Sequence, residues 1–305
     1  MADRKILIIA DIEGSSGCTQ RQNAKLFGEG WPKACLEMTR DITAVAKALY
    51  EYGVERIRVQ DFHRTGYNII PSKLHPGVEL QQGYKNGPAL GMGNPKEFQG
   101  LMMIGMHAPS ASGGFLAHTL TSRIERVTIN GKLVSEAQLF ASALAPLGIR
   151  PVFFSGCPVA CSHTRRFLPG VDCFSIDKNT PEFLPDLWRK KLADAAVKSM
   201  NSEWPAPYNP QGPFQVALRM TGKKDATKRL AQNWGLCRKG RDILFEVPDM
   251  NTLFRELSRL AYFTPVTERL LPIGLPLYHM LGRVGLAWVK KKPPVLTKPG
   301  AKFTE

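Results

Sequence analysis

The sequence has few of the features that mark secreted or membrane-spanning proteins. Its six cysteines, at positions 18, 35, 157, 161, 173 and 237, follow no disulfide-framework spacing, so we interpret them as unpaired thiols in a reducing compartment. Cys157 and Cys161 lie four residues apart, which leaves a soft-metal or redox pair as the less favoured alternative. The first apolar run is too short for a signal peptide and acidic residues follow it. The sequence therefore predicts a cytoplasmic protein.

Acidic residues are also scarce, with 26 Asp and Glu against 41 Lys and Arg, and the formal net charge is +15. Basic residues gather around Trp234, at Lys223, Lys224, Lys228, Arg229, Arg238, Lys239 and Arg241. Such a patch can bind nucleic acid or anionic lipid. Because no recognised nucleic-acid motif accompanies it, we disfavour nucleic acid as a partner. A solvated basic surface, or one that attracts acidic peptides, is the preferred interpretation.

What the sequence does contain is the pattern of an α/β protein. The 305 residues allow about two lobes, and an apolar fraction of 43% is ordinary for a globular core. We expect a central, mostly parallel sheet flanked by helices, with a smaller C-terminal α/β lobe. The predicted domains are a metal-binding catalytic domain (1–203), a Pro-rich linker (204–213), a small α/β lobe (214–265) and an apolar, then basic, C-terminal extension (266–305).

Apolar runs and helical periodicity place the individual elements. Strands are expected near residues 5–11, 55–61, 100–106, 125–130, 150–155, 172–176, 214–220 and 242–247. Helices are expected near residues 32–52, 134–146, 158–167, 182–200, 223–233 and 250–262. The segment 63–99 is turn-rich, and we expect it to cover the functional site.

Two carboxylates at the end of the first strand are the most informative feature of the chain. Asp11 and Glu13 end the run Ile6-Leu7-Ile8-Ile9-Ala10. Side chains two residues apart on a strand point to the same face. Two carboxylates that close repel each other unless a positive charge lies between them. The pair therefore indicates a divalent metal site, against the alternative of two solvated acids.

Histidines follow other strand-like runs in the same way. His63 and His107 come directly after two such runs, and His118 follows shortly afterwards. In open α/β sheets, ligands bind beyond the carboxyl ends of the strands, so these side chains can converge with Asp11. Glu136 follows an Asn130-Gly131 turn and lies near the start of a predicted helix.

These motifs, taken in order, resemble the DppA D-aminopeptidase family, peptidase family M55. The resemblance covers roughly residues 5–150 and implies a hydrolase of short peptides with two zinc ions per chain. It also implies a ring-like homo-oligomer, with a decamer as the candidate size. The implied metal ligands are Asp11, Glu13, His63, His107 and Glu136, and the implied catalytic residue is His118. The motifs are Asp11-Ile12-Glu13-Gly14-Ser15-Ser16-Gly17, Asp61-Phe62-His63, Gly105-Met106-His107-Ala108, Ala117-His118-Thr119 and Ile129-Asn130-Gly131 followed by Glu136.

The chemistry of this donor set is consistent without the resemblance. Oxygen and imidazole ligands without thiolate suit zinc, and also manganese or cobalt. Five ligands are too many for one catalytic zinc with an open position, but they fit two metals about 3.5–4 Å apart that share a carboxylate. Asp11 is the expected bridge. For His118 the roles of general base, proton donor, nucleophile and orienting partner all stay open.

Two positions depart from the family pattern and concern the substrate pocket. Cys157-Pro158 replaces an acidic residue after the strand near 150–155. Beyond the next strand the family carries a lysine and an arginine, whereas this chain has residues 175–180, in which Lys178 is the candidate for the lysine. These departures leave D-peptide specificity open. Three hypotheses follow: a zinc-dependent aminopeptidase, another metal-dependent amidase on the same scaffold, and a non-catalytic assembly or binding protein. The intact ligand set favours the first two, because unused buried acids are costly.

The C-terminal extension is apolar from residue 270 to 289 and then basic at Lys290, Lys291 and Lys292. Arg283, His279 and two prolines interrupt it, which argues against a membrane span. We favour packing on a neighbouring subunit over peripheral membrane contact. Residues 293–305 are expected to be mobile.

Overall fold

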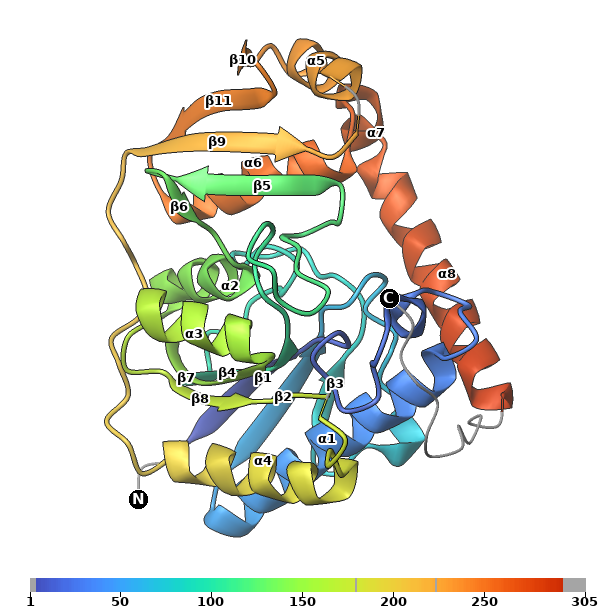
Figure 1. Cartoon of the computed structure of the whole chain (residues 1–305). Helices are drawn as coiled ribbons and strands as arrows, with labels where there is room; N and C mark the ends of the chain where they lie inside the picture. The colour runs from blue at the N-terminus through green and yellow to red at the C-terminus, as the bar shows by residue number, and fades with distance from the viewer. Residues whose placement is uncertain (1–3, 179, 223, 293–305) are drawn as a thin grey trace.

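The centre of the protein is a six-stranded parallel sheet. The computed structural model describes residues 4–178, 180–222 and 224–292 (Figure 1). The strand order is β3-β2-β1-β4-β7-β8, and all neighbours are parallel. The strands are β1 (Lys5–Ala10), β2 (Arg56–Asp61), β3 (Glu79–Gln81), β4 (Gly100–Met106), β7 (Arg150–Gly156) and β8 (Asp172–Ser175). The expected α/β class is confirmed.

Helices cover both faces of this sheet, which is why β1 is apolar from Ile6 onward. One face carries α1 (Trp31–Tyr52) and α4 (Pro185–Ser199), and the other carries α2 (Glu136–Leu144) and α3 (Pro158–Phe167) (Figure 1). Alternate residues of β1 divide between the two cores. Ile6 and Ile8 pack with α1 and α4, whereas Leu7 and Ile9 pack with α2 and α3.

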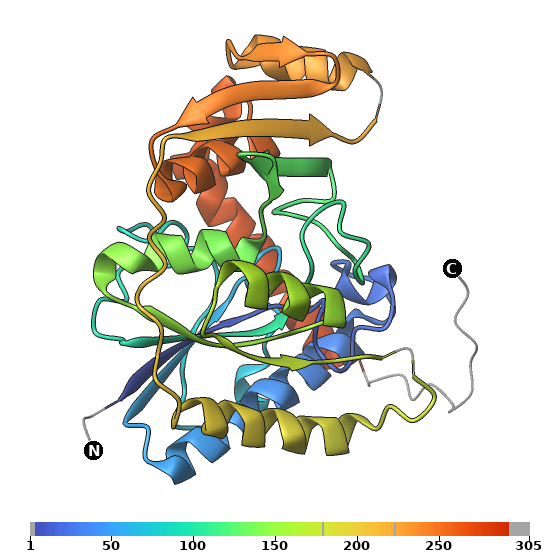
Figure 2. The ribbon, with the colours of Figure 1, turned by 60° about the vertical axis from the view of Figure 1, so that its left-hand side comes forward.

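A second, antiparallel sheet forms a separate layer (Figure 2). Its order is β10-β11-β9-β5-β6. Its strands are β5 (Ile124–Ile129), β6 (Lys132–Leu133), β9 (Phe214–Met220), β10 (Cys237–Lys239) and β11 (Asp242–Val247), and α5 (Lys224–Asn233) and α6 (Met250–Tyr262) accompany them. The division of the chain at residues 204–213 stays a prediction. The strands β5 and β6 precede that division in the sequence but belong to the second sheet.

Most expected elements form within three residues of the predicted bounds. The patterns did not indicate the short strands β3, β6 and β10, the helices α7 (Pro265–Arg269) and α8 (Leu271–Lys291), or the short helices η1 (Arg21–Ala24), η2 (Pro71–Lys73) and η3 (Ala145–Leu147). The expected Asn130-Gly131 turn is confirmed. It joins β5 to β6 with φ values of 48° and 78°, the positive angles that a tight hairpin turn requires.

Helix α8 runs back along the molecule and packs on its own chain. Trp288 stacks on Trp31 with ring centroids 6.0 Å apart and an interplanar angle of 20°. Within the described ranges, no helix combines the length and the apolar character that crossing a bilayer requires. The predicted mobility of residues 293–305 concerns a segment outside the described residues.

The order of strands places a crevice at the carboxyl end of β1. The chain passes from β1 to β2 on one side and later enters β4 on the other side of β1. Loops leaving β1 and β4 therefore diverge, and ligands bind at such a switch point. The start of the loop after β1 still lies close to the end of β4: Gly14 N–H donates to Gly105 O over 2.7 Å. A Cβ on Gly105 would lie 2.2 Å from Asp11 O.

This close approach predicts a large effect of one methyl group. Gly105→Ala should lower the free energy of unfolding by about 3 kcal/mol or more, because it combines a positive φ with a backbone clash. Gly131→Ala is the matched control, since both residues have φ of +78° but nothing lies within 4 Å of a Cβ at Gly131. The control should cost about 1 kcal/mol. Urea unfolding measures both, and equal losses would contradict the proposed close approach.

Candidate metal centre

The five predicted ligands converge at the carboxyl edge of the parallel sheet. Asp11 and Glu13 follow β1, His63 follows β2, and His107 follows β4 directly. Glu136 is the first residue of α2, where Ser135 caps the helix by accepting the Gln138 N–H. Each of the five is at most 8% exposed. The structure thus brings the predicted ligands together, and it places His118 beside them.

One group of possible ligands comprises Asp11, Glu13 and His63, whose donor atoms lie within 4.8 Å of one another. His63 Nδ1 lies 3.1 Å from Asp11 Oδ1 and 2.8 Å from Glu13 Oε2. These three residues come from the ends of two adjacent parallel strands, β1 and β2. They supply two oxygens and one nitrogen, a donor set that suits zinc, manganese or cobalt.

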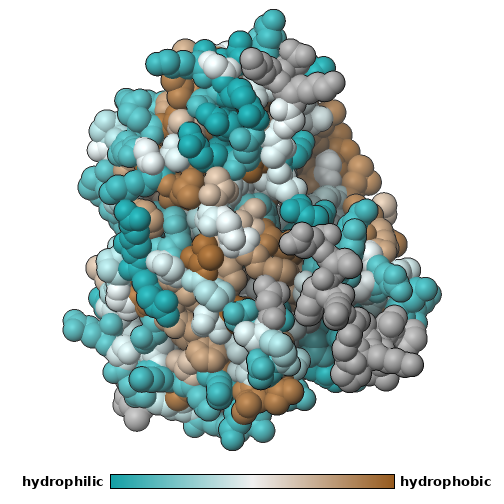
Figure 3. All heavy atoms as spheres, in the orientation of Figure 1, coloured by the Kyte–Doolittle hydropathy of each residue, from teal (hydrophilic) through white to brown (hydrophobic). Residues whose placement is uncertain are grey.

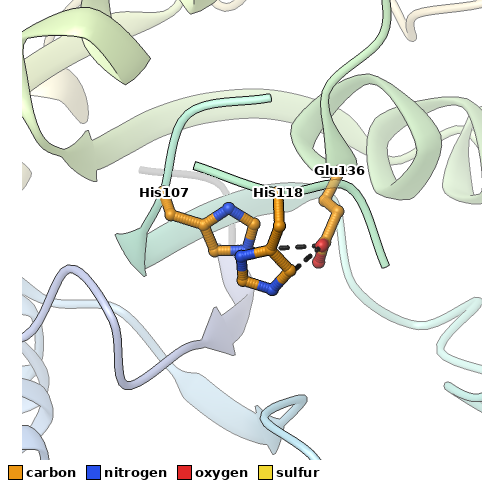
Figure 4. A group of neighbouring side chains, drawn as sticks. All are labelled: His107, His118 and Glu136. Atoms are coloured by element: carbon orange, nitrogen blue, oxygen red, sulfur yellow. Dashed lines mark ion pairs between the residues drawn. The ribbon is translucent and has the colours of Figure 1, made fainter. Parts of the chain in front are cut away.

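A second group comprises His107, His118 and Glu136. His107 Nε2 lies 3.3 Å from Glu136 Oε1, and His118 Nε2 lies 4.0 Å from the same oxygen. The two imidazole rings stack with centroids 3.7 Å apart (Figure 4). Sequence reasoning gave His118 a catalytic or an orienting role, whereas the geometry also makes it a possible metal ligand.

Asp11 joins the two groups. Its Oδ1 faces His63, and its Oδ2 lies 3.4 Å from His107 Nε2. One carboxylate thus presents one oxygen to each group, as a carboxylate shared by two metals does. This geometry is consistent with the bridging role expected for Asp11.

Backbone carbonyls fix which nitrogen of each histidine faces the centre. His63 Nε2 lies 2.8 Å from Ala24 O, His107 Nδ1 lies 3.1 Å from Ala108 O, and His118 Nδ1 lies 2.8 Å from Leu116 O. A carbonyl oxygen only accepts, so these nitrogens carry the hydrogens. The other nitrogen of each neutral ring then directs a lone pair at the carboxylates. Such an arrangement is repulsive unless a proton or a metal ion lies between them.

A buried carboxylate oxygen supports the same interpretation. Glu13 Oε2 accepts no hydrogen bond from any described residue, although it is buried. His63 Nδ1 is close to this oxygen, but it does not make a hydrogen bond to it. A buried carboxylate oxygen that accepts no hydrogen bond is costly. The donor set, the histidine orientations and this oxygen therefore fit divalent cations.

The pKa shifts show that the buried carboxylates of the centre strongly favour positive charge beside them. Burial, followed by the Glu13 carboxylate, raises the pKa of Asp11 to about 7. Burial alone would lower the pKa of His107, but the charge of Glu136 and a hydrogen bond to it raise that pKa to about 10. The pKa of His63 is raised well above its usual value, because Glu13 and Asp11 outweigh its burial. Without metal ions, protons on the histidines balance the carboxylates.

His118 differs from the other donors in distance and exposure. Its side chain is 18% exposed, and it stays 4.0 Å from both Glu13 Oε1 and Glu136 Oε1. Burial, and then the charge of His107, lowers the pKa of His118. A neutral imidazole at the rim of the centre can accept a proton.

The loop that carries His118 is strained and held by hydrogen bonds. Leu116 and Leu120 have φ values of 48° and 62°, which cost free energy for residues other than glycine. Leu120 N–H donates to Glu136 Oε1 over 2.7 Å, and the Tyr262 hydroxyl of α6 donates to Leu120 O. The same loop thus positions His118 and orients a predicted ligand.

Three charged side chains support the loop after β1. Lys178 is 6% exposed, and its Nζ donates to Glu13 O over 2.7 Å and to Ser15 O over 3.0 Å. Asp41 of α1 accepts from both the N–H and the hydroxyl of Ser16 at 2.8 Å. Arg189 of α4 donates to Asp41 over 2.9 Å. The candidate role of Lys178 therefore has a physical basis: it holds the main chain of a predicted ligand.

Sequence reasoning missed Asp41 and Arg189. A signal for Asp41 was present, because it lies three residues after Met38 and four before Val45, inside the apolar stripe of α1. A charged residue in such a stripe needs a buried partner. Arg189 gave no comparable signal, since its contact with Asp41 joins residues that lie 148 positions apart in the sequence.

Two cavities lie near the centre. A cavity of about 210 Å³ is lined by Gly113, Gly114, Phe115, Cys157, Pro158, Val159, Ile176, Asp177 and Lys178. It adjoins the segment before His118 and includes the Cys157-Pro158 departure. A larger cavity of about 490 Å³ lies on the loop between β1 and α1, and none of the six candidate residues lines it. The residues that line this larger cavity therefore give no reason to place the reaction there.

Comparison with known proteins points in the same direction. The family model for peptidase M55, described as D-aminopeptidase, matches residues 4–258. A curated D-aminopeptidase from Bacillus subtilis (strain 168) is 23% identical over 172 residues, which span 56% of this chain and 63% of the relative. The aligned region thus covers less than two thirds of that relative.

A solved structure shows the same fold. It is the Zn-dependent D-aminopeptidase DppA from Bacillus subtilis, described as a self-compartmentalizing protease. The superposition covers 84% of this chain and 96% of that chain, with a TM-score of 0.74 and 18% sequence identity.

The shared position of Asp11 predicts unequal losses of metal. The native protein should hold about two zinc ions per chain, Glu136→Gln about one, and Asp11→Asn well below one, because only Asp11 faces both groups. Elemental analysis after dialysis against zinc measures the content. Asp194→Asn is the control, since Asp194 is exposed on α4 and lies outside the centre. Equal losses in the two ligand variants would argue against a bridging Asp11.

Proposed function

The chain belongs to peptidase family M55, the D-aminopeptidases, and from this membership we propose that it is a zinc-dependent aminopeptidase. Its substrates are short peptides that contain D-amino acids, and it releases their N-terminal residue. The observation that carries the proposal is the position of Asp11 between two buried groups of ligands. When bound there, a pair of zinc ions supplies Lewis acidity and lowers the pKa of water toward about 7.

The residues of the chain divide the remaining work. Asp11, Glu13, His63, His107 and Glu136 hold the metals in this proposal, and His118 is the catalytic residue. His118 Nδ1 lies 2.8 Å from Leu116 O, so its Nε2 is the nitrogen that accepts a proton from the attacking water. The same nitrogen then returns the proton to the departing amine.

The size of the adjoining cavity supports a short substrate. At about 210 Å³ it falls below the roughly 300–1,000 Å³ of ordinary ligand pockets, so it suits the side chain of one residue. Lys178 contributes to its wall, but Lys178 Nζ is already engaged by two carbonyl oxygens. We assign this cavity to a substrate side chain and the Cys157 position to its specificity.

A homo-oligomer is part of the proposal. The structural relative is described as a self-compartmentalizing protease, and a ring that encloses its active sites would admit only short peptides. A ring-like assembly, with a decamer as the predicted size, would give this chain the same selectivity. Mass measurement in solution tests the number of subunits.

A panel of dipeptides tests the activity. Zinc-loaded protein should release the N-terminal amino acid from D-configured dipeptides, and a chelator should abolish the release. Release is measured by chromatography of the products, with the matching L-dipeptides in parallel. Hydrolysis of other amides without any dipeptide cleavage would favour a different metal-dependent amidase. A zinc-loaded protein that hydrolyses neither class would support a binding or assembly role.

Substitution of His118 separates catalysis from metal binding. His118→Ala should lower kcat by about 10²–10⁴, the usual contribution of a general base, with the zinc content unchanged. Stopped assays and elemental analysis on the same preparation provide both values. Loss of one zinc ion per chain would reassign His118 as a metal ligand, and an unchanged kcat would refute its catalytic role.

A further inference from the structure

Exposed apolar side chains concentrate at the C-terminal end of the described chain. Of the fourteen exposed large hydrophobic residues in the described ranges, nine lie between Tyr262 and Val284. Four of them form a stripe on α8 with spacings of four, three and four residues: Ile273, Leu277, Met280 and Val284. Val266 of α7 and Leu270 between the two helices continue the same spacing. The space-filling view shows apolar surface along this flank (Figure 3).

The opposite side of α8 packs against the rest of the protein. Gly282, Leu286 and Val289 are buried. A Cβ on Gly282 would lie 2.3 Å from the Tyr67 ring, so α8 approaches the body too closely to rotate. The apolar stripe is therefore the outer face of a fixed helix. It is not a core face that a small rotation could bury.

The charges on this helix all have one sign. Residues 271–291 contain Arg283, Lys290 and Lys291 and no acidic residue, and Lys292 follows directly. Lys290 and Lys291 are exposed. Arg269 lies just before the helix. The acidic residue beside it, Glu268, pairs with Arg259, whose Nε lies 2.7 Å from Glu268 Oε1. The outer face thus combines apolar side chains with cations that are not balanced locally.

Two partners could cover such a face, a second copy of the chain or a lipid bilayer. Pairing of α8 with α8 of another copy would bring these cations together without any acid to offset them, in a chain with a net charge of +15. A stable coiled coil also requires about three to four heptads, and the stripe spans fewer. An anionic bilayer offers complementary charge and an apolar interior.

In place of the subunit contact favoured from the sequence, we propose that α8 is a peripheral membrane-binding helix that docks on anionic bilayers. The helix lies in the plane of the interface, with Ile273, Leu277, Met280 and Val284 among the acyl chains. Lys290 and Lys291 contact anionic headgroups at its C-terminal end. Crossing the bilayer is not required, since an amphipathic helix binds with one face only. The proposal is independent of the peptidase activity, because none of these residues belongs to the metal centre.

Vesicle sedimentation with the full chain tests the proposal. Native protein should bind vesicles of phosphatidylcholine with 30% phosphatidylserine at least about tenfold more tightly than pure phosphatidylcholine vesicles. Raising the salt from about 0.1 M to 0.5 M should weaken this binding, because charges near the surface are screened. Equal affinity for both vesicle types, or no binding to either, would overturn the proposal.

Two pairs of variants separate the contributions of the stripe and the charges. Ile273→Ser with Leu277→Ser should weaken binding at least about tenfold. The control is Leu184→Ser with Leu187→Ser at the start of α4, because those side chains are 61% and 50% exposed against 66% and 56% for the stripe residues. Lys290→Glu with Lys291→Glu should also weaken binding about tenfold. Its control, Lys190→Glu with Lys191→Glu, makes the same change in net charge at exposed positions of α4.

Light scattering on the same variants tests the competing partner. The membrane proposal fails if the native protein does not bind vesicles and the substitutions at Ile273 and Leu277 cause an oligomer to dissociate. In that case the stripe is a subunit interface. If the α4 controls lose vesicle binding as much as the α8 variants do, binding is nonspecific and the proposal also fails. Unchanged thermal unfolding shows that each variant is folded, and the charge variant provides the test where the stripe variant does not fold.

Discussion

The structure depends on how it neutralises three buried carboxylates. Asp11, Glu13 and Glu136 are each at most 8% exposed, and their charges require cations nearby. The parallel sheet brings them together because β1 lies between β2 and β4, so that side chains following these strands meet at one edge. The histidines complete the centre only because carbonyl oxygens fix their rings. Fold and chemistry are therefore linked at the carboxyl end of β1.

A second set of buried charges maintains this arrangement from outside. Lys178 donates to the main chain at Glu13, and Arg189 with Asp41 holds Ser16. Such groups add little net stability, since desolvation offsets much of their attraction. Their value is geometric: Lys178 joins two carbonyl oxygens of the loop, and Asp41 links Ser16 of the loop to Arg189 of α4. A loop built from Gly14, Ser15 and Ser16 has no bulky side chains to position it, so directional hydrogen bonds do so.

The sequence predicted the sheet and the candidate ligands because both depend on local pattern. Apolar runs located the strands, and Asp11, His63 and His107 could be placed because they follow strand ends. Glu136 was found through the Asn130-Gly131 turn. Contacts between distant segments were not predictable. The pairing of β5 with β9 across 85 or more residues, the support from Arg189, and the proximity of His118 to Glu136 all arise from tertiary packing. The helix α8 was not predicted, because its prolines and its apolar residues on all sides gave no helical pattern.

Helix α8 also links the outer surface to the metal centre. Trp288 stacks on Trp31 and packs edge-on against Phe27. Phe27 lies three residues after Ala24, and the Ala24 carbonyl orients the His63 ring. Tyr278 stacks on Tyr84, and the Tyr84 hydroxyl donates to the carbonyl of Arg64, the residue after His63. The inner face of α8 thus contacts both segments that position this histidine. A partner that covers the outer face leaves these contacts in place, because the apolar stripe and the packing face are on opposite sides. Surface binding and metal coordination can therefore occur together in one molecule.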